Sequence, residues 1–147
     1  MLGYLVLFLL SVTTLGFAGM SYRFDRASGR RRLMELPESP LVSIIIPAYK
    51  AEKTIERALR SAVGSDYPNK EIIVVNDSAD KTPGIARKFG AKVIQNTKRT
   101  GKGGAINTAA KIARGEFMLV LDADAELKVN TLSNLVRSYG TYKNAGE

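Results

Sequence analysis

Short apolar, β-branched runs alternate with helix-forming stretches from residue 42 onward, and this alternation restricts the fold more than any other feature. VSIII (42–46), EIIVVN (71–76) and FMLVL (117–121) predict buried strands, and KVIQ (92–95) predicts a shorter one. Strands joined by helices of this length require right-handed crossovers and a parallel sheet covered on both faces. We therefore expect an α/β fold with a doubly wound, mostly parallel sheet.

Four helices are expected between and after these strands. Thr82 followed by Pro83 is typical of an N-cap and a first helical residue, and Gly115 is expected to end the third helix. Apolar residues at helical spacing define the faces that pack on the sheet. The expected helices cover residues 55–63, 82–89, 102–114 and a last stretch through Leu132, Leu135, Val136 and Tyr139.

The first twenty residues predict a transmembrane helix. Leu2 to Met20 contain no charged residue, and 19 helical residues at about 1.5 Å each nearly cross a hydrocarbon core of about 30 Å. A cleaved signal peptide is disfavoured, because the arginines follow the apolar run instead of preceding it. We expect a single-pass anchor (1–20), a basic juxtamembrane linker (21–40) and a domain (41–147) on the cytoplasmic side of the membrane.

Composition excludes several kinds of chemistry. The 147 residues include no Cys and no His, so thiolate sites, His-ligated zinc and Ser-His-Asp hydrolysis are absent. The net charge is +8, and residues 81–114 hold nine basic residues and no acidic one. Nucleic acid is not the expected partner, because no recognition motif and no interleaved aromatic residues accompany the charge. A basic band followed by an acidic segment suits a polyanionic ligand bridged by a cation.

Asp122 and Asp124 directly follow the fourth strand. Ligands of open α/β sheets bind at the carboxyl ends of the strands, and two carboxylates on alternate residues there can converge on Mg²⁺ or Mn²⁺. The alternative is that one of them bonds its own turn or caps the next helix. We favour the metal interpretation because of the position after a buried strand.

Three other features lie at expected strand ends. Tyr49 follows the first strand and either stacks on a base or is an ordinary loop tyrosine. Asp77 follows the second strand and either accepts a hydrogen bond from a uracil imide or forms an Asx turn. The glycine-rich stretch 100–104, with Lys102, either receives a phosphate at a helix N-terminus or is a flexible connection.

Four segments occur in order that together resemble the family 2 glycosyltransferases of GT-A fold. They are VSIIIPAYKAEKTIERALRSA, EIIVVNDSADKT, GKGGAINTAA and ARGEFMLVLDADAEL, and the match runs from about Val42 to Val136. Membrane-anchored branches, cellulose- or hyaluronan-synthase-like and dolichyl-phosphate sugar synthase-like, are nearest. The resemblance implies inverting transfer of a sugar from a nucleotide diphosphate, a UDP-sugar here, to an acceptor hydroxyl on a glycan or lipid-linked acceptor, as in polysaccharide biosynthesis.

The resemblance also assigns roles to residues of this sequence. It implies that Asp124, with Asp122, holds Mg²⁺ or Mn²⁺. Two departures concern base recognition: Lys50 and Ala51 stand where the family has Asn-Glu, and the Asp-Asp-Gly-Ser turn is shortened here. The residues implied to bind the nucleotide sugar are Pro47, Tyr49, Asp77, Lys102 and Asp122.

The catalytic base is not evident, since Glu126 lies too near the acidic pair to be nominated. We expect the chain to be the donor-binding half of an enzyme that needs a C-terminal half or partner subunit. The alternative is a non-catalytic, membrane-tethered nucleotide-sugar-binding module or a truncated copy. A dinucleotide-dependent oxidoreductase is disfavoured, because no glycine-rich turn follows the first strand.

Overall fold

A single parallel sheet organises the part of the chain that the computed structural model describes, residues 39–144. Its strands are β1 (Val42–Ala48), β2 (Lys70–Asn76), β3 (Lys92–Gln95) and β4 (Phe117–Val120), in the order β3-β2-β1-β4. Every neighbouring pair is parallel. The predicted parallel α/β sheet is confirmed.

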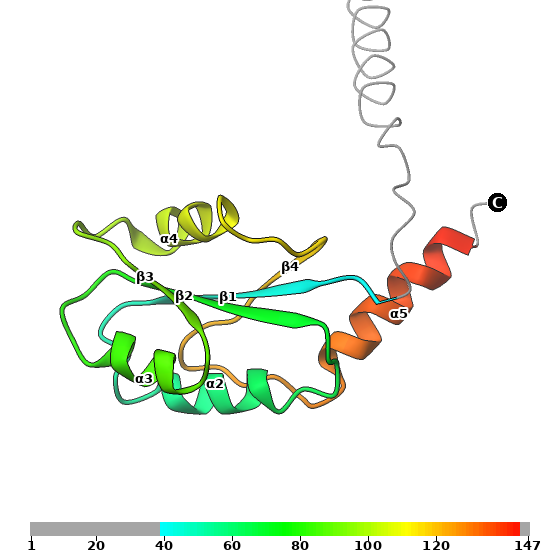
Figure 1. Cartoon of the computed structure of the whole chain (residues 1–147), viewed down its shortest axis with the longest axis horizontal. Coiled ribbons are helices and arrows are strands. Elements are labelled where there is room, and N and C mark those ends of the chain that lie inside the picture. The colour runs from blue at the N-terminus through cyan, green and yellow to red at the C-terminus, as the bar shows by residue number, and fades with distance from the viewer. Residues whose placement is uncertain (1–38, 145–147) are drawn as a thin grey trace, which may run out of the picture. The chain divides into compact units, whose positions relative to one another are not determined.

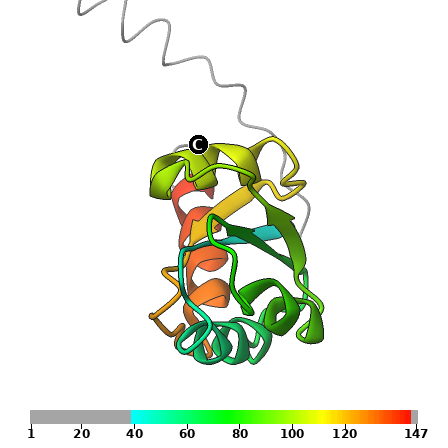
Figure 2. The same cartoon turned by 90° about the vertical axis from the view of Figure 1, so that its left-hand side faces the viewer.

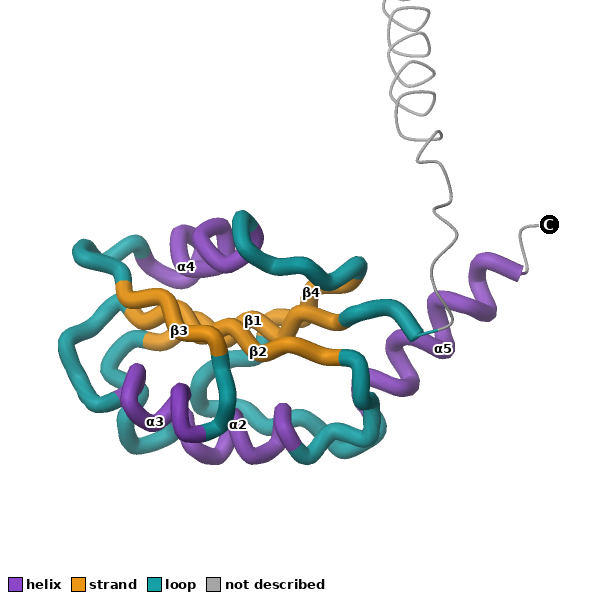
Figure 3. Tube along the Cα trace, in the orientation of Figure 1, coloured by secondary structure: helices purple, strands orange, loops and turns teal. Residues whose placement is uncertain are grey.

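Helices cover both faces of this sheet. They are α2 (Ile55–Val63), α3 (Thr82–Lys88), α4 (Gly101–Ala110) and α5 (Thr131–Asn144). Helices α2 and α3 lie on one face and α4 lies on the other, as Figures 1 and 3 show from the side of the sheet. The view turned by 90° shows the same three layers (Figure 2). The doubly wound arrangement follows from these crossovers.

The central strand β1 is buried on both faces, which explains why all of its residues except Ser43 are apolar. Ile44 and Ile46 belong to the core beneath α2, whereas Ile45 packs with Ala105 and Ala109 of α4. The three isoleucines have no exposed surface. Successive side chains of a strand point to opposite faces, so a strand between two helical layers is expected to be apolar at nearly every position.

The winding direction of the chain reverses beside β1. The chain proceeds outward from β1 to β2 and β3, then crosses the sheet through α4 and adds β4 on the other side of β1. Such a reversal leaves a crevice between the carboxyl ends of the two strands that flank it, and doubly wound proteins bind ligands there. The fold therefore directs attention to the ends of β1 and β4.

The start of α3 differs from the sequence prediction. Thr82 is the first helical residue and not the N-cap. Its hydroxyl and backbone N–H both donate to the carboxylate of Asp80, at 2.8 and 3.2 Å. The predicted N-cap is therefore wrong by one residue: Lys81 is the N-cap and makes no capping hydrogen bond with its side chain, while Asp80 accepts the N–H of Thr82.

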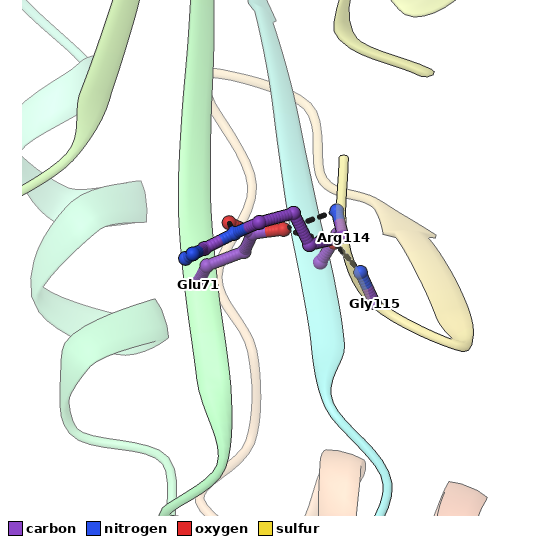
Figure 4. A network of polar contacts seen from close by, with 4 residues as sticks. Glu71, Arg114 and Gly115 are labelled. Atoms are coloured by element: carbon purple, nitrogen blue, oxygen red, sulfur yellow. Dashed lines mark hydrogen bonds and ion pairs between the residues drawn. The ribbon is translucent and has the colours of Figure 1, made fainter. Parts of the chain in front are cut away.

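The end of α4 also differs, because tertiary hydrogen bonds replace helical ones. The helix ends at Ala110, and the N–H groups of Arg114 and Gly115 donate instead to Glu71 and Ser43, at 2.7 and 2.9 Å. Figure 4 shows this network at the amino end of the sheet. A Cβ on Gly115 would lie 2.6 Å from the backbone nitrogen of Ser43, so only glycine allows this approach.

Glu71 is the acidic centre of that network. Burial raises the pKa of Glu71, but hydrogen bonds from the Arg114 N–H, the Ser43 hydroxyl and the Arg114 guanidinium outweigh it and lower the pKa below its ordinary value. The carboxylate accepts from the Ser43 hydroxyl at 2.7 Å and from Arg114 Nε at 3.2 Å. An ionised Glu71 thus joins β1, β2 and the α4–β4 connection.

The strand predicted at residues 117–121 is confirmed as β4, but the expectation that it is buried is wrong. β4 ends at Val120, and Met118 and Val120 are 55% and 43% exposed. Within residues 39–144, β4 pairs with β1 alone and is an edge strand, so alternate side chains reach the surface.

Candidate functional site

A cavity of about 230 Å³ lies at the carboxyl ends of β1, β2 and β4, at the switch point of the sheet. The structure brings together all five residues predicted to bind the ligand: two from the end of β1, one each after β2 and β4, and one from the first turn of α4. The lining residues are Pro47, Ala48, Tyr49, Asp77, Arg99, Gly101, Lys102, Ala105 and Asp122.

Tyr49 is 43% exposed and lines this cavity, and two cationic side chains lie over its ring. The guanidinium carbon of Arg99 lies 4.1 Å from the ring centroid, and Lys50 Nζ lies 5.5 Å from it. Both distances are typical of cation–π contacts. The Tyr49 ring therefore presents a stacking surface that Arg99 occupies in the structure.

Sequence reasoning missed Arg99. It lies in the loop between β3 and α4, and only the return of this loop across the sheet places it over Tyr49. The signal that could have identified it is a basic residue just before a glycine-rich helix start at an expected strand end. Nothing in the local sequence singles out Arg99 from its neighbour Lys98.

Lys102 and Asp122 form an ion pair inside the cavity. Lys102 Nζ lies 2.5 Å from Asp122 Oδ1, although the two residues are far apart in sequence. Both side chains are more than half exposed, so the pair contributes little to stability. A cation and a carboxylate held together by a weak contact can exchange partners when a ligand of mixed charge arrives.

Asp77 holds the N-terminus of α4 in place. Its Oδ2 accepts hydrogen bonds from the N–H groups of Thr100 and Gly101, at 2.7 and 2.8 Å. Its Oδ1 accepts from Asn96 Nδ2 at 2.6 Å and from the Thr100 hydroxyl at 3.2 Å. Gly101 has a φ of +72°, and the right-handed then left-handed pair Thr100–Gly101 forms a backbone nest that binds an anion.

The anion in the nest is therefore the protein's own carboxylate. Burial raises the pKa of Asp77, but the donors Asn96, Thr100 and Gly101 outweigh it and lower the pKa below its ordinary value. Four donors fill the lone-pair positions that a carboxylate offers. Contact between Asp77 and a uracil stays a prediction, and it requires the Asp77 carboxylate to give up one of these four hydrogen bonds.

The turn after β2 is held by other residues than Asp77. Asn76 is fully buried, and its Nδ2 donates to Ser78 O, Asp80 Oδ1 and Gln95 Oε1, at 2.5, 3.2 and 3.1 Å. The Thr82 N–H donates to Asp80 Oδ1, so the Asx turn considered for Asp77 is formed by Asp80 instead. This division leaves the carboxylate of Asp77 directed at α4 and the cavity.

Asp122 and Asp124 lie in the turn after β4, where the Ala125 N–H donates to Asp122 O at 3.0 Å. Asp122 lines the cavity, whereas Asp124 is exposed and does not line it. Within residues 39–144, no three His, Cys, Asp or Glu side chains lie close enough together to hold a metal ion by themselves. Two exposed carboxylates still fit Mg²⁺ or Mn²⁺, since such ions take one or two carboxylates and complete their shell with phosphate and water.

Glu126, which was not nominated as a base, is held by an arginine. Arg57 Nε of helix α2 lies 2.8 Å from Glu126 Oε1. This contact directs Glu126 toward α2. The structure offers no reason to nominate it.

The adjacent glycines of α4 give a matched test of how closely this helix turn is packed. A Cβ at Gly104 would lie 2.5 Å from Thr100 Cβ, whereas one at Gly103 would meet nothing within 4 Å. We expect Gly104→Ala to lower the free energy of unfolding by about 1–2 kcal/mol through displacement of Thr100. Gly103→Ala is expected to raise it by up to about 1 kcal/mol, because alanine stiffens the unfolded chain.

Chemical denaturation of both variants, followed by circular dichroism, measures these changes. Equal effects of the two substitutions would contradict the close contact between Gly104 and Thr100.

A family model and the sequences of known proteins match the part of the chain that forms the sheet and the cavity. The family model described as glycosyl transferase family 2 matches residues 43–146. The chain is 35% identical over 116 residues to the UDP-Glc:alpha-D-GlcNAc-diphosphoundecaprenol beta-1,3-glucosyltransferase WfgD of Escherichia coli, covering 70% of this chain and 46% of that protein. The chain spans between a third and a half of the length of the first curated relatives that it matches.

Solved structures show the same similarity. S. aureus TarS 1-349 in complex with UDP-GlcNAc has a TM-score of 0.64 and 35% identity, covering 66% of this chain and 30% of that one. A mannosyltransferase from Pyrobaculum calidifontis in complex with GDP-Man and Mn²⁺ has a TM-score of 0.63 and 29% identity, covering 86% of this chain and 41% of that one.

Proposed function

The chain belongs to glycosyltransferase family 2, and from this we propose that it binds the nucleotide-sugar donor of an inverting, metal-dependent sugar transfer. One observation carries the proposal: an aromatic ring, a cation and a carboxylate from separate elements meet in one cavity at the switch point of the sheet. A nucleoside diphosphate needs a stacking surface, a positive charge for phosphate and a place for its cation. The cavity contains the ring of Tyr49 and the ammonium group of Lys102, and Asp122 contributes one carboxylate toward the proposed cation.

The roles proposed for the residues follow from their positions. Tyr49 stacks beside the base once Arg99 moves aside, and Lys102 binds the diphosphate. A divalent ion, when bound, neutralises charge on the departing diphosphate. Asp122 and Asp124 are the residues that would hold it. Pro47 and Asp77 shape the base end of the cavity.

Lys102 contributes to the reaction by stabilising its transition state. Charge accumulates on the diphosphate as the bond to the sugar breaks, so a fixed ammonium group stabilises the transition state more than the bound donor. In the structure, Asp122 neutralises that ammonium group. We propose that donor binding releases Lys102 from Asp122 and so assembles the site.

A uridine donor is proposed because the E. coli relative is named for UDP-Glc and the S. aureus structure contains UDP-GlcNAc. The P. calidifontis neighbour is in complex with GDP-Man, so guanosine is the competing nucleotide.

Two further parts of the proposal lie outside the described residues. The predicted anchor, Leu2 to Met20, precedes them, and within residues 39–144 no helix has the length and apolar character needed to cross a bilayer. We propose a single-pass protein whose donor-binding part faces the cytoplasm. We also propose that acceptor binding and the catalytic base come from a C-terminal half or partner subunit.

Calorimetric titration of the full chain with UDP and GDP, each with and without Mn²⁺, tests the proposal. We expect UDP binding that requires Mn²⁺ and is reduced at least 10-fold by Asp124→Asn. Absence of binding by either nucleotide, or binding that is indifferent to Mn²⁺ and to Asp124→Asn, would contradict it. Sugar transfer after addition of a matching C-terminal half separates an enzyme from a non-catalytic binding module.

A further inference from the structure

The loop that carries Asp124 is bound to helix α2 through the side chain of Arg57. Arg57 Nη2 donates to the backbone oxygen of Asp124 at 2.8 Å. Its Nε lies 2.8 Å from Glu126 Oε1. One guanidinium group therefore contacts the chain on both sides of Ala125. No sequence pattern indicated this, since α2 was expected only to pack an apolar face on the sheet.

The same helix and the loop after it hold the following residues of the segment. The Leu127 N–H donates to the Ser61 hydroxyl oxygen at 3.0 Å. The Val129 carbonyl accepts from the Asp66 N–H at 3.0 Å and from the Ser65 hydroxyl at 3.3 Å. These hydrogen bonds restrain the segment 124–129, and Arg57 makes the contact nearest to Asp124.

Arg57 has little to contribute to overall stability. Its side chain is 61% exposed and that of Glu126 is 54% exposed, and an ion pair of this kind contributes at most about 1 kcal/mol. The planar guanidinium group, however, fixes two acceptors in one geometry, which an ammonium group cannot do. The geometry of Arg57 therefore suits a positional role more than a stabilising one.

From these contacts we infer that Arg57 is a positioning residue that sets where the Asp124 carboxylate meets the divalent cation. The inference rests on the proposed function. Mg²⁺ and similar ions demand a nearly fixed arrangement of ligands, and loss of a residue that orients a ligand typically weakens metal binding about 10- to 100-fold. Without Arg57, Asp124 would keep its carboxylate but lose its fixed position relative to Asp122.

Arg60 provides a matched control. It lies on the same helix, is 68% exposed and pairs with Glu56 of α2 itself, at 2.5 Å. Arg57→Ala and Arg60→Ala remove the same side chain from neighbouring positions. Only the first removes a contact with the loop after β4.

The experiment measures the Mn²⁺ affinity of the full chain in saturating UDP by calorimetry, with melting temperatures recorded in parallel. We expect Arg57→Ala to weaken Mn²⁺ binding about 10-fold and Arg60→Ala to change it less than 2-fold, with similar melting temperatures for both variants. Arg57→Lys, which keeps the charge but not the fork, is expected to lie between wild type and Arg57→Ala. It also serves as the test variant if Arg57→Ala does not fold.

The outcomes separate the two proposals. Wild-type Mn²⁺–UDP binding that Arg57→Ala and Arg57→Lys leave unchanged overturns the positioning role alone. An equal loss in Arg57→Ala and Arg60→Ala also overturns it, because the effect would then come from the helix and not from the loop contact. Absence of Mn²⁺–UDP binding in the wild-type chain overturns the proposed function and this inference together.

Discussion

Asp77→Ala is expected to lower the free energy of unfolding by about 2–3 kcal/mol and to weaken UDP binding at least 10-fold. The substitution leaves the N–H groups of Thr100 and Gly101 and the amide of Asn96 without their acceptor. Hydrogen bonds to a charged group contribute about 1.5–3 kcal/mol each when they are lost singly, and partial exposure reduces the sum. The N-terminus of α4 would lose its fixed place, and with it the position of Lys102.

Urea denaturation at several pH values measures the first effect. The lowered pKa of Asp77 means that its contribution is complete above its ordinary pKa, near 3.9, and is lost as the pH falls through the lower folded value. The difference in stability between wild type and Asp77→Ala should therefore be constant near neutral pH and shrink below about pH 4.

Two variants serve as comparisons. Asp77→Asn keeps the size but only one acceptor oxygen, so it should lose at least half as much stability as Asp77→Ala. Asp66, an exposed carboxylate that accepts from the Ser133 hydroxyl at 2.9 Å, should tolerate alanine with a loss below about 1 kcal/mol. A normal stability combined with lost UDP binding in Asp77→Ala would instead favour direct base recognition.

Lys102→Met is expected to weaken Mn²⁺-dependent UDP binding about 10- to 100-fold with little change in stability. Methionine is an unbranched side chain only one atom shorter than lysine and has a similar helix propensity, but it removes the charge that faces the cavity. A charged contact to phosphate corresponds to about 1.5–3 kcal/mol, whereas an exposed ion pair contributes at most about 1 kcal/mol to folding. The two measurements therefore separate a ligand-binding role from a structural one.

A second effect of Lys102→Met distinguishes partner exchange from simple charge loss. Because Asp122 is then unpaired, we expect Mn²⁺ without nucleotide to bind a few-fold more tightly than in wild type. Lys111→Met, at the other end of α4, removes the same charge away from the cavity and should leave both affinities within about 2-fold. Unchanged UDP affinity in Lys102→Met would rule out its proposed contact with the diphosphate.

Asp77→Ala and Lys102→Met both test the contacts that the cavity residues make with one another. In the structure the cavity already contains three polar contacts: Lys102 pairs with Asp122, Asp77 accepts hydrogen bonds from the start of α4, and Arg99 lies over the ring of Tyr49. A nucleotide-sugar donor with its cation would replace the Lys102–Asp122 and Arg99–Tyr49 contacts with contacts of the same kind. The hydrogen bonds of Asp77 stay, because they hold the helix that presents Lys102.

The sequence by itself determined the sheet and the residues that gather at its edge. A run such as VSIII, apolar at four of its five positions, suits a strand whose two faces are both covered, and that requirement predicts the layered parallel fold. The carboxyl ends of parallel strands share one edge, so the sequence predicts that Tyr49, Asp77 and Asp122 lie together, as they do in the cavity.

Tertiary structure alone decided what these residues contact. The acceptor role of Asp77 depends on a loop that begins about twenty residues later, and Arg57 reaches Asp124 across a gap of 67 residues. The edge position of β4 and the early end of α4 likewise depend on which strands and side chains lie alongside. Periodicity and strand-end position are local properties of a chain, whereas a hydrogen bond between distant segments depends on distances that only the folded packing fixes.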